Sequence, residues 1–256
     1  MNFYKILNKE ETHYGLKYHD GLNVDPLPFN PSGNCEPGGI YFSREDILAF
    51  LNFDSVWIRQ VTLPEGEPVY EIPGSPKKWK AKRVILGPRR RINFQVIKQL
   101  VEDGANIHTF DDWPLSWAAD RGRLDIVEFL VEKGANIHAG TDYALRIAAR
   151  NGYLDIVKFL VSKGADVHVA NNYALILAAA NGHLSTVKFL VSKGADIYAE
   201  NNYALVIAAT NGYLDVVKFL VEKGMDVHAH NDGALRWAAK NGHVDVVKFL
   251  ETYNNN

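Results

Sequence analysis

The chain has 256 residues, of which 47% are hydrophobic, so it can form one large or two ordinary domains with a buried core. Its first residues include acids where a signal peptide needs an apolar stretch, and no run of about 18 apolar residues occurs. We therefore expect an intracellular protein with no membrane span, in the cytoplasm or alternatively in the nucleus. Cys35 is the only cysteine, which excludes an intramolecular disulfide and argues against a thiolate zinc site.

Residues 1–91 contain no repeat and most of the prolines, and we interpret them as a small α+β domain. Ser43, followed three residues later by Asp46, predicts the start of a short helix that runs to about Phe53. Residues 56–63 and 67–72 have the composition of two strands joined by a turn, and residues 79–86 that of a third strand.

This region also contains the few groups that suggest catalysis. Cys35 is a candidate thiolate nucleophile, with His13 or His19 as its base and Asp20 or Asp25 to orient the imidazole. Nothing in the spacing of these residues supports such a site, and a lone cysteine is more often buried or incidental. We expect no enzyme activity, and an enzyme in the first domain remains an alternative.

The net charge of −2 conceals a basic run between residues 77 and 91, which holds eight lysines or arginines and no acid. Trp79 lies among these cations, as in many proteins that bind single-stranded nucleic acid. The run also fits a solvated edge strand, where lysines deter aggregation, or a nuclear-import signal. Nucleic-acid binding is an alternative here, and the basic residues are Lys77, Lys78, Lys80, Lys82, Arg83, Arg89, Arg90 and Arg91.

Residues 92–256 repeat with a period of 30. One leucine and two glycines recur in each period, and two glycines suggest two helices, each ended by a residue with positive φ. These columns are Leu115, Leu145, Leu175, Leu205 and Leu235, then Gly122, Gly152, Gly182, Gly212 and Gly242, and Gly104, Gly134, Gly164, Gly194 and Gly224.

One unit illustrates the expected local structure. Asp142 belongs to a column of only Asp and Asn, which predicts an N-cap for a first helix over residues 143–151. Residues 154–163 form an amphipathic second helix, with Lys158 and Ser162 directed outward. Paired alanines on the first helix let the two helices approach closely, and residues 165–168 are expected to connect units in extended form.

The segment "ALRIAARNGYLDIVKFLVSKGADVHV" resembles ankyrin repeats, and the resemblance recurs in five full units. It implies a mainly α, ankyrin-like α-solenoid at residues 92–256 that binds other proteins, with no cofactor or metal. Two features depart from the family. Tyr143-Ala144-Leu145-Arg146 replaces Thr-Pro-Leu-His, and the period is about three residues shorter than the usual 33, which leaves too little chain for a full projecting β-hairpin.

The segments "GLNVD…FNPSGNCEPGGIYF" and "KWKAKRVIL" resemble the leader module of ankyrin proteins from giant DNA viruses of amoebae. This resemblance implies a viral protein that acts in a host cell, and it implies no activity for the module.

Residues 92–103 align only with a second helix, so the array begins with a half repeat. We expect the domain over residues 1–91 to cover it as a cap. Histidines at 108, 138, 168 and 228 form a column, with Tyr198 at the remaining position. A shared metal is excluded because units stack about 8 to 10 Å apart, whereas zinc lies about 2 Å from each imidazole nitrogen. We expect these histidines to bond to neighbouring backbone.

The partner-binding surface is predicted on the concave face of the solenoid, where units that are otherwise alike differ. Ile176 and Val206 are expected to be exposed at its centre, so that changing both to aspartate should abolish binding without unfolding. An adaptor for ubiquitin ligase is disfavoured because no F-box-like segment follows Leu250. The predicted residues are Ser116, Trp117, Asp120, Arg146, Arg150, Ile176, Ala180, Val206, Thr210, Arg236, Trp237 and Lys240.

Overall fold

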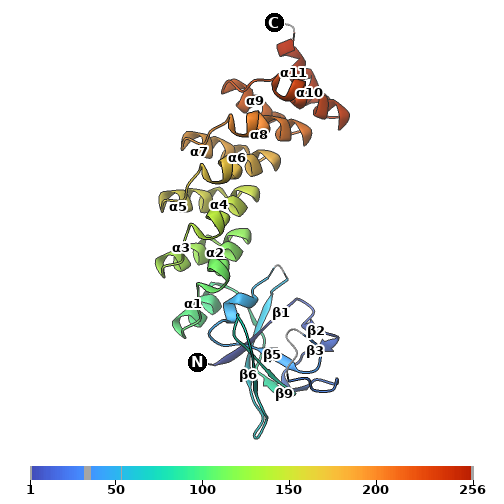
Figure 1. The fold of residues 1–256 in the computed structure, drawn as a ribbon, viewed down its shortest axis with the longest axis vertical. Helices are drawn as coiled ribbons and strands as arrows, with labels where there is room; N and C mark the ends of the chain where they lie inside the picture. The colour runs from blue at the N-terminus through green and yellow to red at the C-terminus, as the bar shows by residue number, and fades with distance from the viewer. Residues whose placement is uncertain (1, 32–35, 53, 255–256) are drawn as a thin grey trace. The chain divides into compact units, whose positions relative to one another are not determined.

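The computed structural model describes residues 2–31, 36–52 and 54–254 (Figure 1). The chain divides into two compact units, one formed by residues 1–117 with 129–135 and the other by residues 118–128 with 136–256. All the strands lie in the first unit, in residues 2–91, which we call the N-terminal module. None of the helices described is long and apolar enough to cross a membrane.

The N-terminal module is built from short antiparallel strands. Strand β6 is central, because β1 pairs with it on one side and β9 and β10 on the other, while β4 extends this sheet beyond β9. A second sheet has the order β5-β8-β7, and β2 and β3 form a hairpin. The strands are β1 (Phe3–Leu7), β2 (Thr12–His13), β3 (Leu16–Lys17), β4 (Gly21–Val24), β5 (Ile40–Phe42), β6 (Trp57–Thr62), β7 (Tyr70–Ile72), β8 (Lys78–Ala81), β9 (Arg83–Leu86) and β10 (Arg90–Arg91).

Large apolar side chains from both sheets meet in the core of the module. Phe42 and Trp79 come from the second sheet, and Leu7, Val61 and Leu86 from the first. All five are at most 6% exposed. Burial of this apolar area is the main force that holds the two sheets together.

Three predictions for this region need correction. The helix predicted from Ser43 is only a 3₁₀ turn, η1 (Ile47–Phe50), and Ser43 instead donates a hydrogen bond to the carbonyl of Lys77 at 2.6 Å. The predicted end of that helix, Phe53, lies outside the described residues. The predicted hairpin is also wrong, because β6 and β7 belong to different sheets, and the single strand predicted over 79–86 is two strands, β8 and β9, again in different sheets.

The rest of the chain is helical. Among residues 92–254, all of which are described, there is no strand, so the short period indeed leaves no β-hairpin. The helices are α1 (Phe94–Glu102), α2 (Thr109–Asp120), α3 (Leu124–Glu132), α4 (Ala139–Arg150), α5 (Leu154–Ser162), α6 (Val169–Ala180), α7 (Leu184–Ser192), α8 (Ala199–Thr210), α9 (Leu214–Glu222), α10 (Ala229–Lys240) and α11 (Val244–Asn254).

Each first helix begins with a left-handed turn. In α4, residues 140–142 have φ between 51° and 61°, so the right-handed helix starts at Tyr143, as predicted. The predicted N-cap role of Asp142 is wrong. This side chain is buried, and its Oδ1 accepts a hydrogen bond from the backbone N–H of Asp166 in the next repeat at 3.1 Å. Only Asp and Asn occupy this column because they tolerate the left-handed region and carry a short acceptor.

The connectors between repeats are turns, so the predicted extended form is also wrong. The carboxylate Oδ1 of Asp166 accepts a hydrogen bond from the backbone N–H of His168 at 2.8 Å, which closes an Asx turn. The same bond recurs in the neighbouring connectors, from His138 to Asn136 and from Tyr198 to Asp196. The two glycine columns have positive φ throughout, as predicted.

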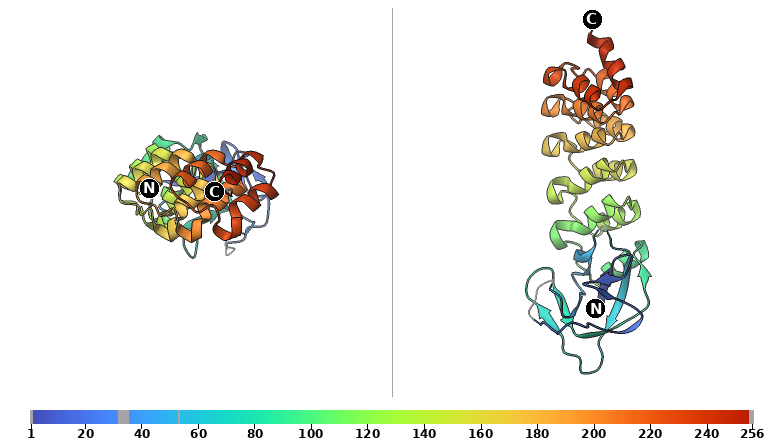
Figure 2. Two further views of the ribbon diagram at one scale, coloured as in Figure 1. Left: turned by 90° about the horizontal axis from the view of Figure 1, so that it is seen from above. Right: turned by 90° about the vertical axis from the view of Figure 1, so that its right-hand side faces the viewer.

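In the second unit, the first helices α4, α6, α8 and α10 stack in one row and the second helices α5, α7, α9 and α11 in another (Figure 1). The right-hand view of Figure 2 shows the pairs as successive layers from yellow-green to red. Ala148 and Ala149 are fully buried, as are Ala178 and Ala179, because small side chains let the rows pack closely.

The half repeat begins as expected, without a first helix. Helix α1 follows strand β10, and Asn93 caps it by accepting a hydrogen bond from the N–H of Val96 at 3.0 Å. Within the first unit, two indole N–H groups of α2 bond to the N-terminal module. Trp113 donates to the carbonyl of Leu51 at 2.6 Å, and Trp117 to that of Asn52 at 3.1 Å.

Removing residues 1–91 is expected to lower the melting temperature of the remaining array. The shortened chain should keep its helical circular dichroism, since the repeats contact mainly their neighbours. It loses the acceptors of Trp113 and Trp117 and the surface beside α1, so buried polar and apolar groups become exposed. Thermal melts of residues 92–256 and of the whole chain test this. Equal melting temperatures would contradict a capping role for the module.

Candidate protein-binding surface

A row of tyrosines lies on the exposed side of the first helices. Tyr173 and Tyr203 are the first right-handed residues of α6 and α8, and they are 42% and 41% exposed. Tyr143 occupies the same place in α4 and is half-buried. Each tyrosine follows the buried Asx residue, which fixes the start of its helix. Aromatic side chains that are partly exposed on a rigid support are common in protein interfaces.

Tyr173 and Tyr203 line a recess of about 350 Å³ that extends over three successive repeats. Ile176 lies deep in it and is only 4% exposed. The remaining lining comes from the left-handed turns, through Ala170, Glu200 and His230. Glu200 accepts a hydrogen bond from Asn171 at 2.5 Å, which links two successive turns. The lining therefore combines Ile176 and two tyrosines with the polar residues Glu200 and His230, and such a mixture can accept a protruding side chain.

Cationic side chains lie on α4, next to this recess, and on α10, which lines one end of it. Arg146 donates to the carbonyls of Gly140 and Thr141 at 2.7 and 3.0 Å, so the left-handed turn holds its guanidinium in place. Arg236 is held in the same way by the carbonyl of His230 at 3.0 Å. Lys240 lies 4.5 Å from the ring centre of Trp237, whose side chain is 43% exposed. These charges favour a partner with acidic groups around its contact.

The structure divides the predicted partner-binding residues by exposure. Arg150, Arg236, Trp237 and Lys240 are exposed, and Asp120, Arg146, Ala180 and Thr210 are half-buried. The remaining four, Ser116, Trp117, Ile176 and Val206, are buried.

The expectation that Ile176 and Val206 are exposed is wrong, because the next repeat covers this column. A Cβ atom added to Gly233 of α10 would lie 3.6 Å from Val206, which shows how closely the two helices pack. Aspartate at either position would be a buried charge and would unfold the array. The predicted tolerance of that double change rested on exposure and no longer follows.

The tyrosine row was not among the predicted residues, although the sequence contains a signal for it. The column reads Trp113, Tyr143, Tyr173, Tyr203 and Gly233. In the family pattern this position holds threonine. The replacement of that small residue by a large aromatic one is part of the departure described above. Because Tyr173 and Tyr203 are about two-fifths exposed, this departure places aromatic side chains on the surface of the array.

The basic run is not the solvated edge that its sequence suggests. Strand β8 is the middle strand of its sheet, and Lys78 and Lys80 are buried within it. Several of the other cations have partners. Arg83 pairs with Glu67 at 2.6 Å, Arg89 with Glu11 at 3.0 Å and Lys77 with Glu45 at 3.8 Å, while Lys82 donates to the carbonyl of Leu27. The run therefore does not form a continuous cationic surface of the kind that binds a nucleic-acid backbone.

Three histidines of the column bond to carboxylates, while the hydroxyl of Tyr198 in the same column donates to the backbone carbonyl of Gly224 at 3.5 Å. Nδ1 of His138 lies 3.1 Å from Asp142 of the same repeat, and the pairs at positions 108 and 112 and at 228 and 232 have the same arrangement. In the described part of the chain, no three His, Cys, Asp or Glu side chains are placed to hold a metal ion.

The groups suggested for catalysis are not assembled into a site. Cys35 lies outside the described residues. Asp20 pairs with Arg59, and Asp25 accepts hydrogen bonds from the N–H groups of Gly39 and Leu27 at 2.7 and 2.9 Å, so both carboxylates have other partners than an imidazole.

Comparison with known proteins finds a family match along the repeats. Residues 90–171, 139–201 and 175–256 match the profile described as ankyrin repeats (3 copies). Two proteins of Acanthamoeba polyphaga mimivirus, both named as ankyrin repeat proteins, are 41% identical over 118 residues and 33% identical over 130 residues. The matches cover 43% and 48% of this chain but only 38% and 63% of those relatives. An uncharacterized protein of the same virus is 35% identical over 129 residues, which are 48% of this chain and 93% of that relative.

Proposed function

Because the chain belongs to the ankyrin-repeat family, we propose that its array is a non-enzymatic scaffold that binds a partner protein on the exposed side of the first helices. Ankyrin repeats are generally protein–protein interaction modules. In this proposal, the repeats of the second unit display the binding surface, and the relatives from a virus of amoebae suggest a host protein as the partner.

The recess between Tyr173 and Tyr203 is the observation that carries the proposal. Binding energy in protein interfaces concentrates in a few central side chains that fill a pocket and lose their water, while a polar rim contributes little. The recess offers such a pocket on a rigid support. The cations Arg150, Arg236 and Lys240 are exposed and do not line it, so they would steer an acidic partner more than hold it.

Changing Tyr173 and Tyr203 together to alanine is expected to weaken capture of the main partner from an amoebal lysate by at least about tenfold. Each truncation removes an aromatic wall of the recess, and truncating such an anchor typically costs about 2 kcal/mol or more of binding free energy. Both side chains are about two-fifths exposed, so the melting temperature should change little. Quantitative pull-down with the whole chain, followed by titration of the purified partner, measures the effect.

The matched control is the pair Tyr198→Ala and Tyr253→Ala. These tyrosines are 53% and 40% exposed, and neither lines the recess. The control should keep full capture. If the double change at Tyr173 and Tyr203 folds normally and binds as strongly as the control, the partner does not use this recess and the proposed site is wrong.

A further inference from the structure

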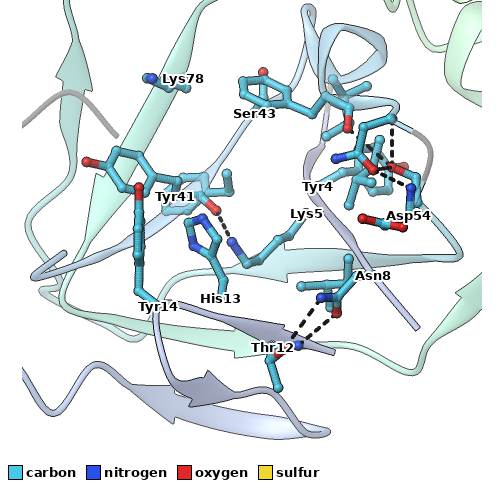
Figure 3. Close-up of a pocket in the computed structure, with 17 residues that line it drawn as sticks. Tyr4, Lys5, Asn8, Thr12, His13, Tyr14, Tyr41, Ser43, Asp54 and Lys78 are labelled. Carbon is cyan, nitrogen blue, oxygen red and sulfur yellow. Dashed lines mark hydrogen bonds between the residues drawn. The ribbon is translucent and has the colours of Figure 1, made fainter. Parts of the chain in front are cut away.

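The N-terminal module contains a cavity that takes no part in the surface of the array. Its volume is about 290 Å³, and it lies among β1, the β2–β3 hairpin, β5 and the segment after η1 (Figure 3). Much of the wall is apolar or aromatic, including Ile6, Leu7, Phe42 and Ile47. A concave site of this size, with apolar walls and a few polar groups, is the usual form of a small-molecule site.

Lys5 supplies a buried ammonium group to this cavity. The residue is 6% exposed, its Nζ donates to the carbonyl oxygen of Tyr41 at 2.8 Å, and it lies 4.8 Å from the ring centre of Tyr18. Figure 3 shows the Lys5 side chain ending between this carbonyl and the His13 ring. In the part of the chain that the structure describes, no carboxylate forms an ion pair with Lys5. A buried ammonium without a counter-ion costs several kcal/mol.

Two further lysines lie beside the ring of Tyr41, whose carbonyl oxygen accepts the hydrogen bond from Lys5. Lys78 and Lys80, both buried, lie 5.4 and 4.6 Å from the ring centre of Tyr41. The charge of Asp25 acts on the pKa values of His13 and Tyr18. Both oxygens of this carboxylate already accept hydrogen bonds from backbone N–H groups. Asp54 is the carboxylate among the residues that line the cavity, and Figure 3 shows it apart from the end of the Lys5 side chain, so an anion that pairs with Lys5 would not have to displace it.

The titration of these groups follows from their burial. Burial lowers the pKa of Lys5 to about 7. Desolvation, and then the charge of Lys5, lowers the pKa of His13 to about 4, although part of this residue is exposed. Burial raises the pKa of Tyr18, which therefore stays neutral. Between pH 6 and 8, Lys5 is thus the group facing the cavity whose charge changes.

We propose that this cavity binds a small organic anion, in which a carboxylate or phosphate group on an apolar body pairs with Nζ of Lys5. The apolar walls would hold the body of the ligand. The acidic group would supply the counter-ion that Lys5 lacks among the described residues, so binding would convert an unfavourable buried charge into a buried pair. This site is independent of the proposed binding surface of the array.

Calorimetric titration of the whole chain tests the proposal with hexanoate, phenyl phosphate and the uncharged hexanamide. At least one of the two anions should bind at pH 6, and at least about tenfold more tightly than hexanamide. Binding of that anion should weaken about tenfold from pH 6 to pH 8, because the fraction of Lys5 that carries a charge falls by that factor. A preference between the anions identifies the acidic group.

Two lysine variants give a matched comparison. Lys5→Met keeps the length of the side chain and removes the charge, and it should abolish anion binding. Lys17→Met makes the same change on the exposed β3 strand and should leave binding unchanged. Absence of binding by both anions, equal binding of hexanamide, or full binding by Lys5→Met would each overturn the proposal.

A second measurement uses the wild-type protein, so it tests the proposal even if Lys5→Met does not fold. With lysine labelled by ¹³C at Cε, nuclear magnetic resonance follows the pKa of the lysine that titrates near neutral pH. Saturating anion should raise this pKa by about one unit or more, since a paired anion favours the charged form. A pKa that stays the same in the presence of the bound anion would show that the ligand lies elsewhere.

Discussion

Gly182→Val is expected to lower the free energy of unfolding of the array by about 3 kcal/mol or more. Gly182 ends helix α6 with φ of 74°, a conformation in which a β-branched residue is strained by about 1 to 3 kcal/mol. A Cβ atom there would also lie 2.4 Å from the ring of Tyr213 in the next repeat, well inside van der Waals contact. The ring would have to leave its place, so two repeats should loosen together.

Gly242→Val separates these two causes. Gly242 belongs to the same column and has φ of 78°, but an added Cβ would meet nothing within 4 Å. In this control, the free energy of unfolding should fall only by the cost of backbone strain, about 1 to 3 kcal/mol. Denaturant unfolding followed by circular dichroism gives both values. Equal losses would show that the contact with Tyr213 contributes nothing, and no loss at Gly182 would show that it does not end a helix.

Arg59→Met is expected to destabilise the N-terminal module by about 3 to 5 kcal/mol, the range for removing one partner of a buried ion pair. Arg59 lies in β6 and is 3% exposed. Its Nε donates to Glu11 at 2.6 Å, it pairs with Asp20, and its Nη1 donates to the carbonyl of Gly87 at 2.7 Å. Methionine fills much of the space but leaves the buried Glu11 with Arg89 as its remaining ion-pair partner.

Lys98→Met is the surface counterpart. Lys98 pairs with Glu102 at 3.8 Å, and both side chains are nearly half exposed, so this pair should contribute less than about 1 kcal/mol. Tryptophan fluorescence follows unfolding of the module through Trp57 and Trp79. A loss at Arg59 no larger than the loss at Lys98 would contradict the importance of the buried pair.

The cost of Arg59→Met should depend on pH. Burial alone would raise the pKa of Glu11, but hydrogen bonds and charges from Arg59 and Arg89 outweigh it and hold this pKa below its usual range. A carboxylate with a lowered pKa stabilises the folded state above its unfolded pKa, and this contribution is lost as the pH falls through the folded value. The difference between wild type and variant should therefore narrow below about pH 4.

The repeats could be predicted from sequence in detail because their stability comes from local patterns. The second helix over 154–163 and the start of the first helix at Tyr143 agree with the structure within a residue. The role of Asp142 could not be predicted, because its partner is a backbone N–H in another repeat. An N-cap and an acceptor between repeats require the same residue types, so composition does not distinguish them.

The N-terminal module was harder to predict because its strands pair across long stretches of chain. Residues 56–63 were identified as a strand, yet its partners come from both ends of the module. For the candidate site, variation between repeats included four exposed side chains, Arg150, Arg236, Trp237 and Lys240, but also four buried ones. Ile176 varies like a surface residue and is nevertheless covered by the following repeat, whereas Tyr173, three residues earlier, is exposed.

The hydrogen bonds between repeats also determine how the chain can fold. They join residues 24 apart, as Asp142 and Asp166, or 33 apart, as Arg150 and His183. In the N-terminal module, Phe3 pairs with Val61 and Gly21 with Leu86, so long loops must close before these strands pair. Folding slows as the mean sequence separation of contacts grows. We therefore expect the repeats to assemble quickly from neighbour to neighbour, while the sheet determines how long the chain takes to reach its native state.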